Sequence, residues 1–478
     1  MKNSNGDHEL RYQKIADLIG QQIYSEVLHI GDRLPSVREV SRIYGVSVST
    51  ALQAYYQLEA KGLIEARPQS GYFVRYCVHR FPDIPSKSKP VIKSRMAETE
   101  AIISTVYENI SAQLKANFSV GVPSSELLPV ARLNKALTEA IRSLPASGTA
   151  YEPIQGNLEL RRQIARTAIH WEGTMTEDDL ITTAGCMNAL SYALMSVTQR
   201  GDTIAVESPV YFGILQLAQS LGLRVIEMPT DPITGVDIST LHKLLQNGKI
   251  QAFVLVSNFS NPLGCSIPDE HKKEIVRLIE QYGIPLIEDD LYGDVYFGRT
   301  RPKNCKTYDE SGLVLWCSSV SKTLAPGYRV GWLAPGQYME RVKQLKMFHS
   351  VSSTTLTHEA IAQFLANGRY EHHLRKLRNT LHGNSLQYAR SISEYFPEGT
   401  KLSRPQGGFM LWVEMNTGFD SYEFYKEAMR YGISIAPGRM FTLQEQYHHC
   451  LRLSYGISWN PGVEAALKQL GRIAREMS

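Results

Sequence analysis

Between residues 180 and 317, short apolar runs alternate with longer stretches of helical character. The apolar runs are rich in β-branched residues and occupy 180–183, 203–207, 224–228, 252–257, 285–288 and 313–317. Continuous apolar runs of this length are typical of strands that are buried on both faces. Their alternation with helices predicts an α/β domain built on a mostly parallel sheet, in which ligands bind at the carboxyl ends of the strands.

Residues 9–76 show a different pattern. An amphipathic helix is indicated by apolar residues at helical spacing: Leu10, Ile15, Leu18, Ile19 and Ile23. A second helix is expected to start at Pro35 or Ser36, and Ser47 is a suitable N-cap for a third over 48–61. Two short strands, 62–66 and 71–74, follow around a polar tip. Helix, helix, turn, helix and hairpin in this order predict a winged helix-turn-helix.

These patterns divide the chain into parts. Residues 77–96 hold three prolines and several basic residues, so we expect a semi-extended basic linker between the winged domain of 9–76 and a domain of 97–478. A helical stretch over 97–114 is expected to begin the larger domain. We expect that domain to consist of a large part, about 120–345, and a smaller α+β part, about 346–478.

Composition excludes several classes of protein. The formal net charge of +4 permits nucleic-acid binding without demanding it. The apolar runs are far shorter than the roughly 20 residues that cross a bilayer, and the polar N-terminus does not resemble a signal peptide. Six cysteines without a C-x-x-C pair predict neither a metal site nor a disulfide framework, and they fit a reducing cytoplasm (Cys77, Cys186, Cys265, Cys305, Cys317 and Cys450).

Residues 33–74 read RLPSVREVSRIYGVSVSTALQAYYQLEAKGLIEARPQSGYFV. Through LPS-x-R, GVS-x-x-T and the final S-G-Y-F-V, this segment resembles the N-terminal domain of GntR-family regulators. The resemblance implies binding to a double-stranded DNA operator. Hydroxyls at the start of a recognition helix can reach base edges or phosphates, and arginines can meet the backbone. The expected DNA-binding residues are Arg33, Ser36, Arg38, Ser47, Ser49, Thr50, Arg67 and Ser70.

The recognition helix departs from the family in one respect. Many relatives carry basic residues where this chain has Val48 and Leu52. We therefore expect specific binding to depend on dimerisation and on the basic linker.

A second resemblance is carried by residues 318–332, SSVSKTLAPGYRVGW. This segment is very similar to the S-x-S-K-x-x-x-P-G-x-R-x-G motif of fold-type I aminotransferases, which bind pyridoxal 5′-phosphate (PLP). The resemblance implies that Lys322 forms a Schiff base with PLP, and a buried lysine of lowered pKa suits that chemistry. Ser319, Ser321 and Arg329 would hold the phosphate.

Further segments match the same family. The turn Gly185-Cys186-Met187 would cradle the phosphate at a helix N-terminus. Tyr211 would stack on the pyridine ring, Asn261 and Tyr292 would bond its hydroxyl, and Asp289 would pair with its nitrogen. Asp290 remains an alternative to Asp289. Arg452 matches the arginine that binds the carboxylate of an amino acid, and Tyr151 matches a tyrosine that reaches the partner's phosphate in a dimer.

The two modules in this order are the arrangement of MocR-type regulators within the GntR family. That resemblance implies a homodimer in which PLP, with or without an amino acid or amine, acts as an effector. PLP attachment at Lys322 would then bias the DNA-binding heads through the linker. One alternative is a working aminotransferase with an accessory DNA-binding head, because its site residues are all present. Another is a sensor of PLP itself that controls vitamin B6 synthesis.

Overall fold

A computed structural model gives the fold. It describes residues 11–24, 27–29, 31–60, 62–67, 70–74, 82–99, 101–108 and 114–478. The chain forms two compact units, one of residues 1–83 with 386–394 and the other of 84–385 with 395–478.

The first unit has the predicted winged helix-turn-helix order. Its elements are α1 (Arg11–Tyr24), α2 (Val37–Ile43), α3 (Val48–Ala60), β1 (Ile64–Arg67) and β2 (Gly71–Val74), with β1 and β2 antiparallel. The cap predicted at Ser47 is present, since its hydroxyl accepts from the Thr50 amide at 3.1 Å. Of the two residues expected to open α2, Ser36 caps it, and its hydroxyl accepts from the Glu39 amide at 3.2 Å. The three helices and the hairpin bury one apolar core around Tyr55 and Leu58.

The central sheet of the second unit runs in the order β3-β7-β6-β9-β10-β11-β12-β5, and β8 pairs with β7. Neighbours from β7 to β11 are parallel, while β12 and β3 run antiparallel to their neighbours. The mostly parallel sheet and all six predicted strands are therefore confirmed. The strands are β3 (Arg95–Met96), β5 (Ile181–Thr183), β6 (Thr203–Ser208), β7 (Arg224–Asp231), β8 (Gly235–Val236), β9 (Ala252–Leu255), β10 (Leu286–Asp289), β11 (Val314–Ser319) and β12 (Gly331–Ala334).

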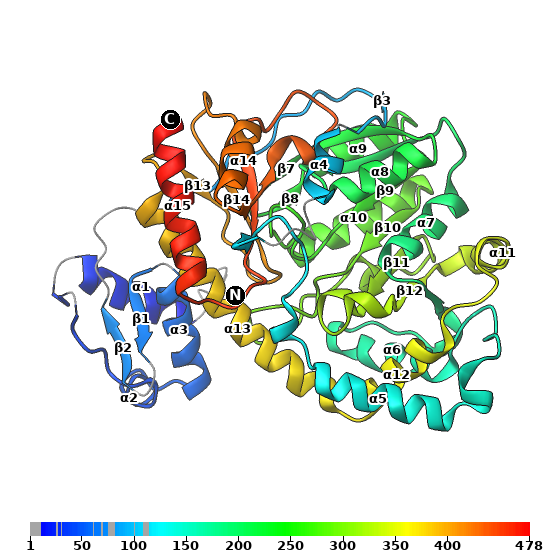
Figure 1. Ribbon diagram of the computed structural model, residues 1–478, viewed down its shortest axis with the longest axis horizontal. Coiled ribbons are helices and arrows are strands. Elements are labelled where there is room, and N and C mark those ends of the chain that lie inside the picture. Colours follow the sequence, from blue (N-terminus) through cyan, green and yellow to red (C-terminus); the bar gives the residue numbers. More distant parts are fainter. Residues whose placement is uncertain are drawn as a thin grey trace, which may run out of the picture. The chain divides into compact units, whose positions relative to one another are not determined.

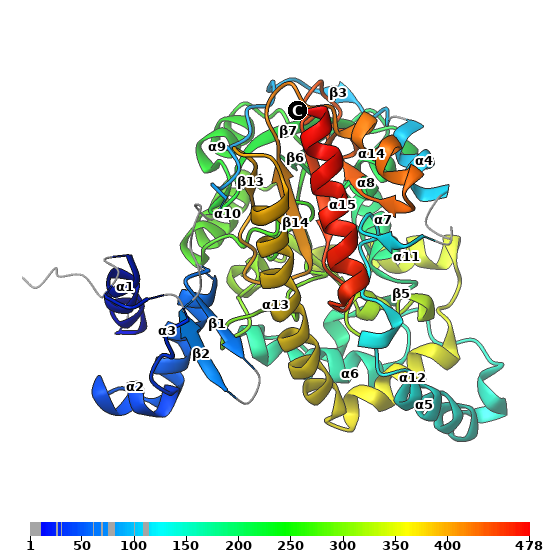
Figure 2. The ribbon, with the colours of Figure 1, turned by 60° about the vertical axis from the view of Figure 1, so that its left-hand side comes forward.

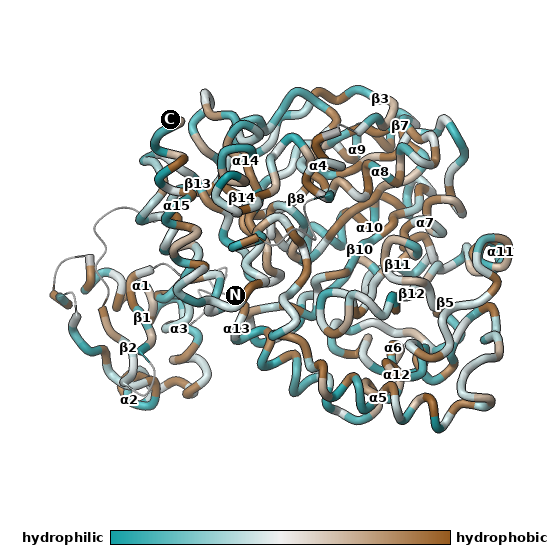
Figure 3. Tube along the Cα trace, viewed as in Figure 1, coloured by the Kyte–Doolittle hydropathy of each residue, from teal (hydrophilic) through white to brown (hydrophobic). Residues whose placement is uncertain are grey.

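Helices cover both faces of this sheet (Figure 1). One face packs on α7 (Cys186–Val197), α8 (Phe212–Ser220) and α11 (Met339–His349), and the other packs on α9 (Ile238–Gln246) and α10 (Asp269–Tyr282). Burial on both faces explains the continuous apolar runs, and Figure 3 shows hydrophobic segments gathered in the strands and the facing helices. A third cluster packs α6 (Leu158–Thr167) and α12 (Thr355–Ala366) around Trp171, Trp316 and Trp332, and α5 (Val130–Ser143) packs on α12.

The smaller part holds an antiparallel sheet in the order β13-β14-β17-β16. Its helix α14 packs on α15 and on β16 (Figure 2). A short parallel pair, β4 with β15, joins residues 116–117 to this part. The elements are α13 (Arg369–Tyr395), α14 (Ser421–Arg430), α15 (Pro461–Met477), β4 (Ala116–Asn117), β13 (Lys401–Leu402), β14 (Met410–Glu414), β15 (Ile433–Ser434), β16 (Ala436–Pro437) and β17 (Cys450–Ser454).

Residues 84–96 differ from a free linker. They run extended along the second unit, and Arg95–Met96 pair with β7 as strand β3. Residues 77–81 of the expected linker, Cys77 among them, lie outside the described residues. Of the helix expected over 97–114, the structure gives α4 (Ala101–Glu108), and residues 109–113 are likewise outside the described ranges.

Candidate functional site

A cavity of about 160 Å³ lies at the carboxyl ends of the parallel strands, as the α/β pattern predicts. Residues from the ends of β6, β9, β10 and β11 meet there because parallel strands finish at one edge of the sheet. The cavity is lined by Cys186, Met187, Leu190, Tyr211, Val256, Asn261, Asp289, Leu291, Tyr292, Ser319, Ser321, Lys322 and Arg329. The sequence singled out most of these residues, whereas Leu190, Val256 and Leu291 carry no signal beyond their apolar character.

Lys322 enters the cavity from a short 3-10 turn directly after β11. Its amine donates to the backbone oxygen of Gly121 and lies 5.9 Å from the ring centre of Tyr292. Burial, together with the nearby cation of Arg452, lowers the pKa of Lys322 to about 8 against the pull of Asp289. The amine is thus neutral over a pH range in which an ordinary lysine is charged, and the neutral form is the one that attacks an aldehyde.

The residues expected to hold a phosphate lie together at the cavity. Helix α7 starts there with Gly185 at its N-cap, and no side chain caps the helix. A Cβ on Gly185 would lie 2.3 Å from Nη2 of Arg329, so only glycine lets the guanidinium approach this closely. Arg329 donates to the Ala184 carbonyl at 3.1 Å, and the hydroxyl of Ser321 lies 3.4 Å from its Nη1. A helix N-terminus, a guanidinium and two serine hydroxyls are the donor set that a phosphate dianion requires.

The carboxylate of Asp289 also lines the cavity and is buried, with 4% of the residue exposed. Asp289 accepts a hydrogen bond from the Leu291 amide at 3.1 Å and one from the Cys186 thiol at 3.5 Å. Burial raises the pKa of Asp289 to about 6, and the neighbouring charge of Asp290 contributes to the rise. The Cys186 side chain therefore faces Asp289, while its backbone begins α7 directly after Gly185.

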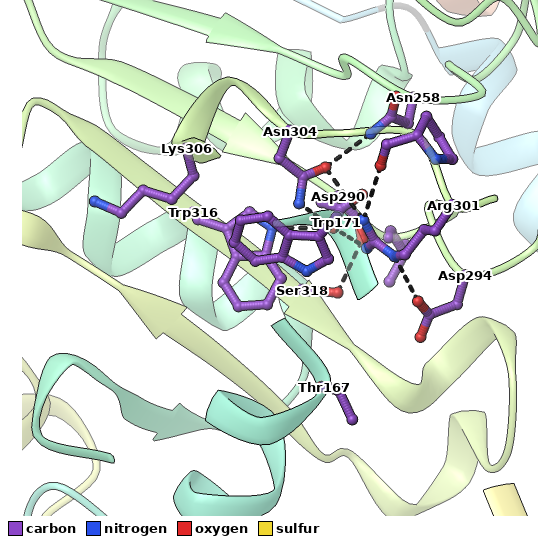
Figure 4. A network of polar contacts seen from close by, with 12 residues as sticks. Thr167, Trp171, Asn258, Asp290, Asp294, Arg301, Asn304, Lys306, Trp316 and Ser318 are labelled. Carbon is purple, nitrogen blue, oxygen red and sulfur yellow. Dashed lines mark hydrogen bonds and ion pairs between the residues drawn. The ribbon is translucent and has the colours of Figure 1, made fainter. Parts of the chain in front are cut away.

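Asp290 points away from the cavity. Its carboxylate accepts hydrogen bonds from Arg301, from Asn304 at 3.0 Å and from the Trp316 indole at 3.0 Å (Figure 4). Asp289 and Asp290 are consecutive at the end of β10, and alternation sends them to opposite sides. Of the two candidates that the sequence left open, the structure thus brings Asp289 to the cavity.

Arg452 comes from β17 of the smaller part and is 1% exposed. It donates to Asn261 at 3.2 Å and to the backbone oxygen of Ser119. Tyr292 lies edge-on to Phe409, with ring centres 5.4 Å apart. The carbonyls of Ser119 and Gly121 thus bind the two cations beside the cavity, a feature that sequence reasoning missed because a backbone acceptor leaves no side-chain signal.

The DNA-binding candidates lie in the winged domain. The hydroxyls of Ser49 and Thr50 each lie 2.8 Å from that of Ser47 at the start of α3. Arg67 pairs with Glu65 at 2.7 Å and covers the Phe73 ring, while Ser70 closes the turn with a hydrogen bond from its amide to the Arg67 carbonyl at 3.0 Å. Arg33, Ser36 and Arg38 are exposed. The backbone of Arg33 pairs in antiparallel fashion with that of Phe73 in the wing.

Comparison with known protein families matches both modules. Residues 11–74 match the family described as bacterial regulatory proteins, gntR family, and residues 114–466 match aminotransferase class I and II. Over 462 residues the chain is 36% identical to the uncharacterized HTH-type transcriptional regulator YjiR of Escherichia coli K12, with 96% of this chain and 98% of YjiR covered. The chain belongs to the GntR family of transcriptional regulators, and its second domain belongs to aminotransferase class I and II.

Other relatives of this GntR-family regulator have the same span. YdcR of Escherichia coli K12, also an uncharacterized HTH-type transcriptional regulator, is 34% identical over 98% of this chain and 99% of its own length. The HTH-type transcriptional regulator NorG of Staphylococcus aureus USA300 is 26% identical over 92% of this chain and 98% of its own length. The module order is that of MocR-type regulators.

Solved aminotransferases share the fold of the regulator's second domain. A multiple substrate aminotransferase from Thermococcus profundus gives a TM-score of 0.74 at 22% identity, covering 80% of this chain and 96% of that one. The α-aminoadipate aminotransferase LysN of Thermus thermophilus gives 0.72 at 24% identity, covering 79% of this chain and 95% of that one. These likenesses show the fold-type I architecture.

Tyr151 of the regulator does not line its own chain's cavity. It is 84% exposed on the loop before α6, beside Glu152, whose amide donates to Ser352 at 3.0 Å. Within the described residues, no helix is long and apolar enough to cross a membrane, and no group of three or more acidic, histidine or cysteine side chains is arranged around a metal position. The five described cysteines are buried and free.

Proposed function

We propose that this transcriptional regulator binds PLP covalently at Lys322 and that occupancy of the cavity by PLP, with or without an amino compound, changes its binding to a DNA operator. One observation carries the proposal: a lysine of lowered pKa and a buried carboxylate face one cavity whose end forms a phosphate cradle. When bound, PLP supplies an aldehyde that condenses with amines and a ring that withdraws electrons.

The residues around the cavity contact different parts of PLP in this proposal. The backbone of Gly185, Cys186 and Met187 holds the phosphate together with side chains at the end of β11. Tyr211 covers one face of the ring, Asn261 and Tyr292 meet its hydroxyl, and Asp289 pairs with its nitrogen. The supporting observation is that Ser319, Ser321, Arg329 and Asp289 line one cavity together with Lys322.

Arg452 gives the proposal a place for a second ligand. Its guanidinium touches Asn261 at the cavity wall, and a guanidinium forms bidentate pairs with carboxylates. A ligand with both an amine and a carboxylate would displace Lys322 from PLP, and it would then join the large part, through PLP, to the smaller part, through Arg452. An amino acid is therefore the favoured effector class.

We further propose a homodimer. Large apolar side chains are exposed on two neighbouring segments that Glu152 and Ser352 connect (Ile154, Leu158, Met347, Phe348 and Val351). Exposed apolar clusters of this kind mark protein interfaces. Tyr151 lies on the first segment, and in a symmetric dimer it would reach the phosphate in the partner's cavity.

Residues 84–96, here called the strap, offer a route from the cavity towards the winged domain. The strap is fastened to the large part, where Lys87 pairs with Asp237 at 2.6 Å and the Ser88 hydroxyl accepts from the Thr230 amide at 2.7 Å. It is also fastened to the smaller part, where the Ser86 amide donates to Glu414 at 2.8 Å. A ligand that sets the separation of the two parts would therefore strain or relax the strap.

One strap contact lies close to the site. The side-chain amide of Gln444 bonds both backbone groups of Val91, at 2.8 and 3.1 Å. Gln444 follows Phe441, whose carbonyl accepts from the amide of Val210, the residue before Tyr211. The strap thus contacts the same loop that positions the aromatic wall of the cavity.

A working aminotransferase remains the second candidate, and the presence of Arg452 beside Lys322 favours it. The test is to capture sheared genomic DNA with the full-length protein, with and without PLP, and to sequence what is retained. Discrete fragments whose retention changes with PLP support a regulator that responds to its cofactor. Discrete fragments that do not change would overturn the effector role, and no selective retention would leave transamination assays to establish the second candidate.

A further inference from the structure

Next to the cavity residue Asp289, the buried guanidinium of Arg301 forms ion pairs with two acids. Arg301 bonds Asp290 and also donates to Asp294 at 2.7 Å, and its side chain is 5% exposed (Figure 4). The carboxylate of Asp290 is fully buried. Two acids and one buried base cannot be separated here without leaving an uncompensated charge in a poorly solvated place.

Asp290 is also fixed through its backbone. Its amide donates to the Cys317 carbonyl at 2.9 Å, and its carbonyl accepts from the Ser318 hydroxyl at 2.8 Å. These bonds tie the end of β10 to β11 and fix the backbone that carries Asp290 directly after Asp289. The charge of Asp290 therefore stays at a fixed, short distance from Asp289.

We propose that Arg301 is a positioning residue that neutralises Asp290 from behind the site, so that Asp289 stays ionised where it faces the cavity. The inference rests on the proposed binding of PLP, since an ionised Asp289 is needed to pair with a protonated ring nitrogen. Arg301 lies outside the residues that line the cavity, so its effect on the cofactor passes through Asp290.

The ionisation of Asp289 depends on the charges that surround it. Lys322 favours its ionised form, whereas Asp290 disfavours it. Glu207 lies near as well, and burial raises its pKa well above the ordinary value, which favours its protonated form. The thiols of Cys186 and Cys317 are also held neutral by burial, which raises their pKa values. Asp290 is then the charged neighbour whose influence depends on Arg301.

Removing Arg301 and removing Asp290 should shift the pH titration of the groups at the cavity in opposite directions. In Arg301→Met, the unpaired charge of Asp290 favours protonated groups at the cavity. In Asp290→Asn, Arg301 stays paired with Asp294 but one negative charge next to Asp289 is lost, which disfavours them. In the double variant neither charge is present, so the cavity should return to the behaviour of the parent protein.

The experiment uses full-length protein loaded with PLP and records the absorption spectrum of the bound cofactor against pH. The measured quantity is the midpoint pH at which the absorption of the bound cofactor changes. We expect this midpoint to rise by about one pH unit in Arg301→Met and to fall by a similar amount in Asp290→Asn. In Asp290→Asn/Arg301→Met it should return close to the parent value. Asp294→Asn is the matched control, because it removes the other carboxylate that pairs with Arg301, and Asp294 does not adjoin Asp289. This variant should have a lower thermal stability. Its midpoint should stay within a few tenths of a pH unit of the parent value.

The outcomes separate the claims. A double variant that stays displaced like Arg301→Met, or a midpoint that does not move in either single variant, would show a purely structural role for Arg301. If Arg301→Met does not fold, Asp290→Asn alone still tests the inference. The inference expects a lower midpoint in this variant, and an unchanged or raised midpoint contradicts it. A parent protein that acquires no cofactor absorption would instead overturn the proposed function.

Discussion

Arg452 donates to Asn261 at 3.2 Å, which joins the smaller part of the second domain to the large part at the wall of the cavity. Asn261 follows β9 and lines the cavity, while Arg452 lies on the central strand pair of the small sheet. Under the proposed function, this buried cation would bind the carboxylate of a ligand whose amine is bonded to PLP.

Arg452→Ala should abolish the response to amino acids while PLP attachment remains. Charge-assisted hydrogen bonds to a carboxylate contribute about 1.5–3 kcal/mol, so affinity for an amino acid should fall roughly tenfold to a hundredfold. The measurement is the spectral change of bound PLP on titration with an amino acid. Amines without a carboxylate are the control ligands, and an equal loss with those amines would contradict the assignment.

Attachment of PLP to Lys322 should accelerate as pH rises through about 8. Burial lowers the pKa of this amine from 10.5 to about 8, and only the neutral amine attacks. At pH 7 roughly a tenth of the molecules should therefore be reactive. Stopped-flow mixing of apoprotein with PLP gives the rate, and peptide mapping after borohydride reduction gives the site. A midpoint near that of an ordinary lysine would mean that the amine is solvated.

Gln444→Ala should weaken the effect of PLP on DNA binding without removing either activity. The variant loses both hydrogen bonds to Val91 of the strap. The ratio of operator affinities with and without PLP should shrink about threefold or more, as for residues that couple two sites. Fluorescence anisotropy with a captured operator measures the ratio. Gln337→Ala, at an exposed position, is the control, and an equal change in both variants would exclude the strap.

Arg38→Ala should weaken binding to all DNA sequences. Arg38 is exposed on α2, and loss of a phosphate contact reduces the slope of log affinity against log salt by about one. Anisotropy titrations at several salt concentrations give this slope. Arg430→Ala removes the same charge from an exposed pair with Glu427 in the second domain and should leave it unchanged. An unchanged slope in Arg38→Ala would exclude this residue from the DNA interface.

Local patterns in the sequence were enough to predict the helices and the hairpin of the winged domain and six strands of the central sheet. Ser36 and Ser47 were predicted as helix starts, and both side chains cap helices. The strand ending at Asp289 was predicted from four apolar or acidic residues, because a strand buried on both faces must be apolar along most of its length. Such features depend on near neighbours in the chain, which the sequence displays directly.

The strap shows where local patterns fail. Prolines and lysines over 77–96 predict extended backbone, and residues 84–96 are extended. Nothing in the pattern indicates that Ser86, Ser88 and Val91 bond residues more than a hundred positions away. Hydrogen bonds of an extended segment have no periodicity, so their partners are visible only in the folded chain.

Sequence motifs alone established the two modules, their order and the set of residues expected at the cofactor site. Tertiary packing settled which of two adjacent acids faces the cavity, where Arg301 stands, and which carbonyls bind Lys322 and Arg452. The physical reason is that a motif records residue types at fixed spacing. The direction of a side chain, its burial and the charge behind it depend on residues brought together from distant parts of the chain.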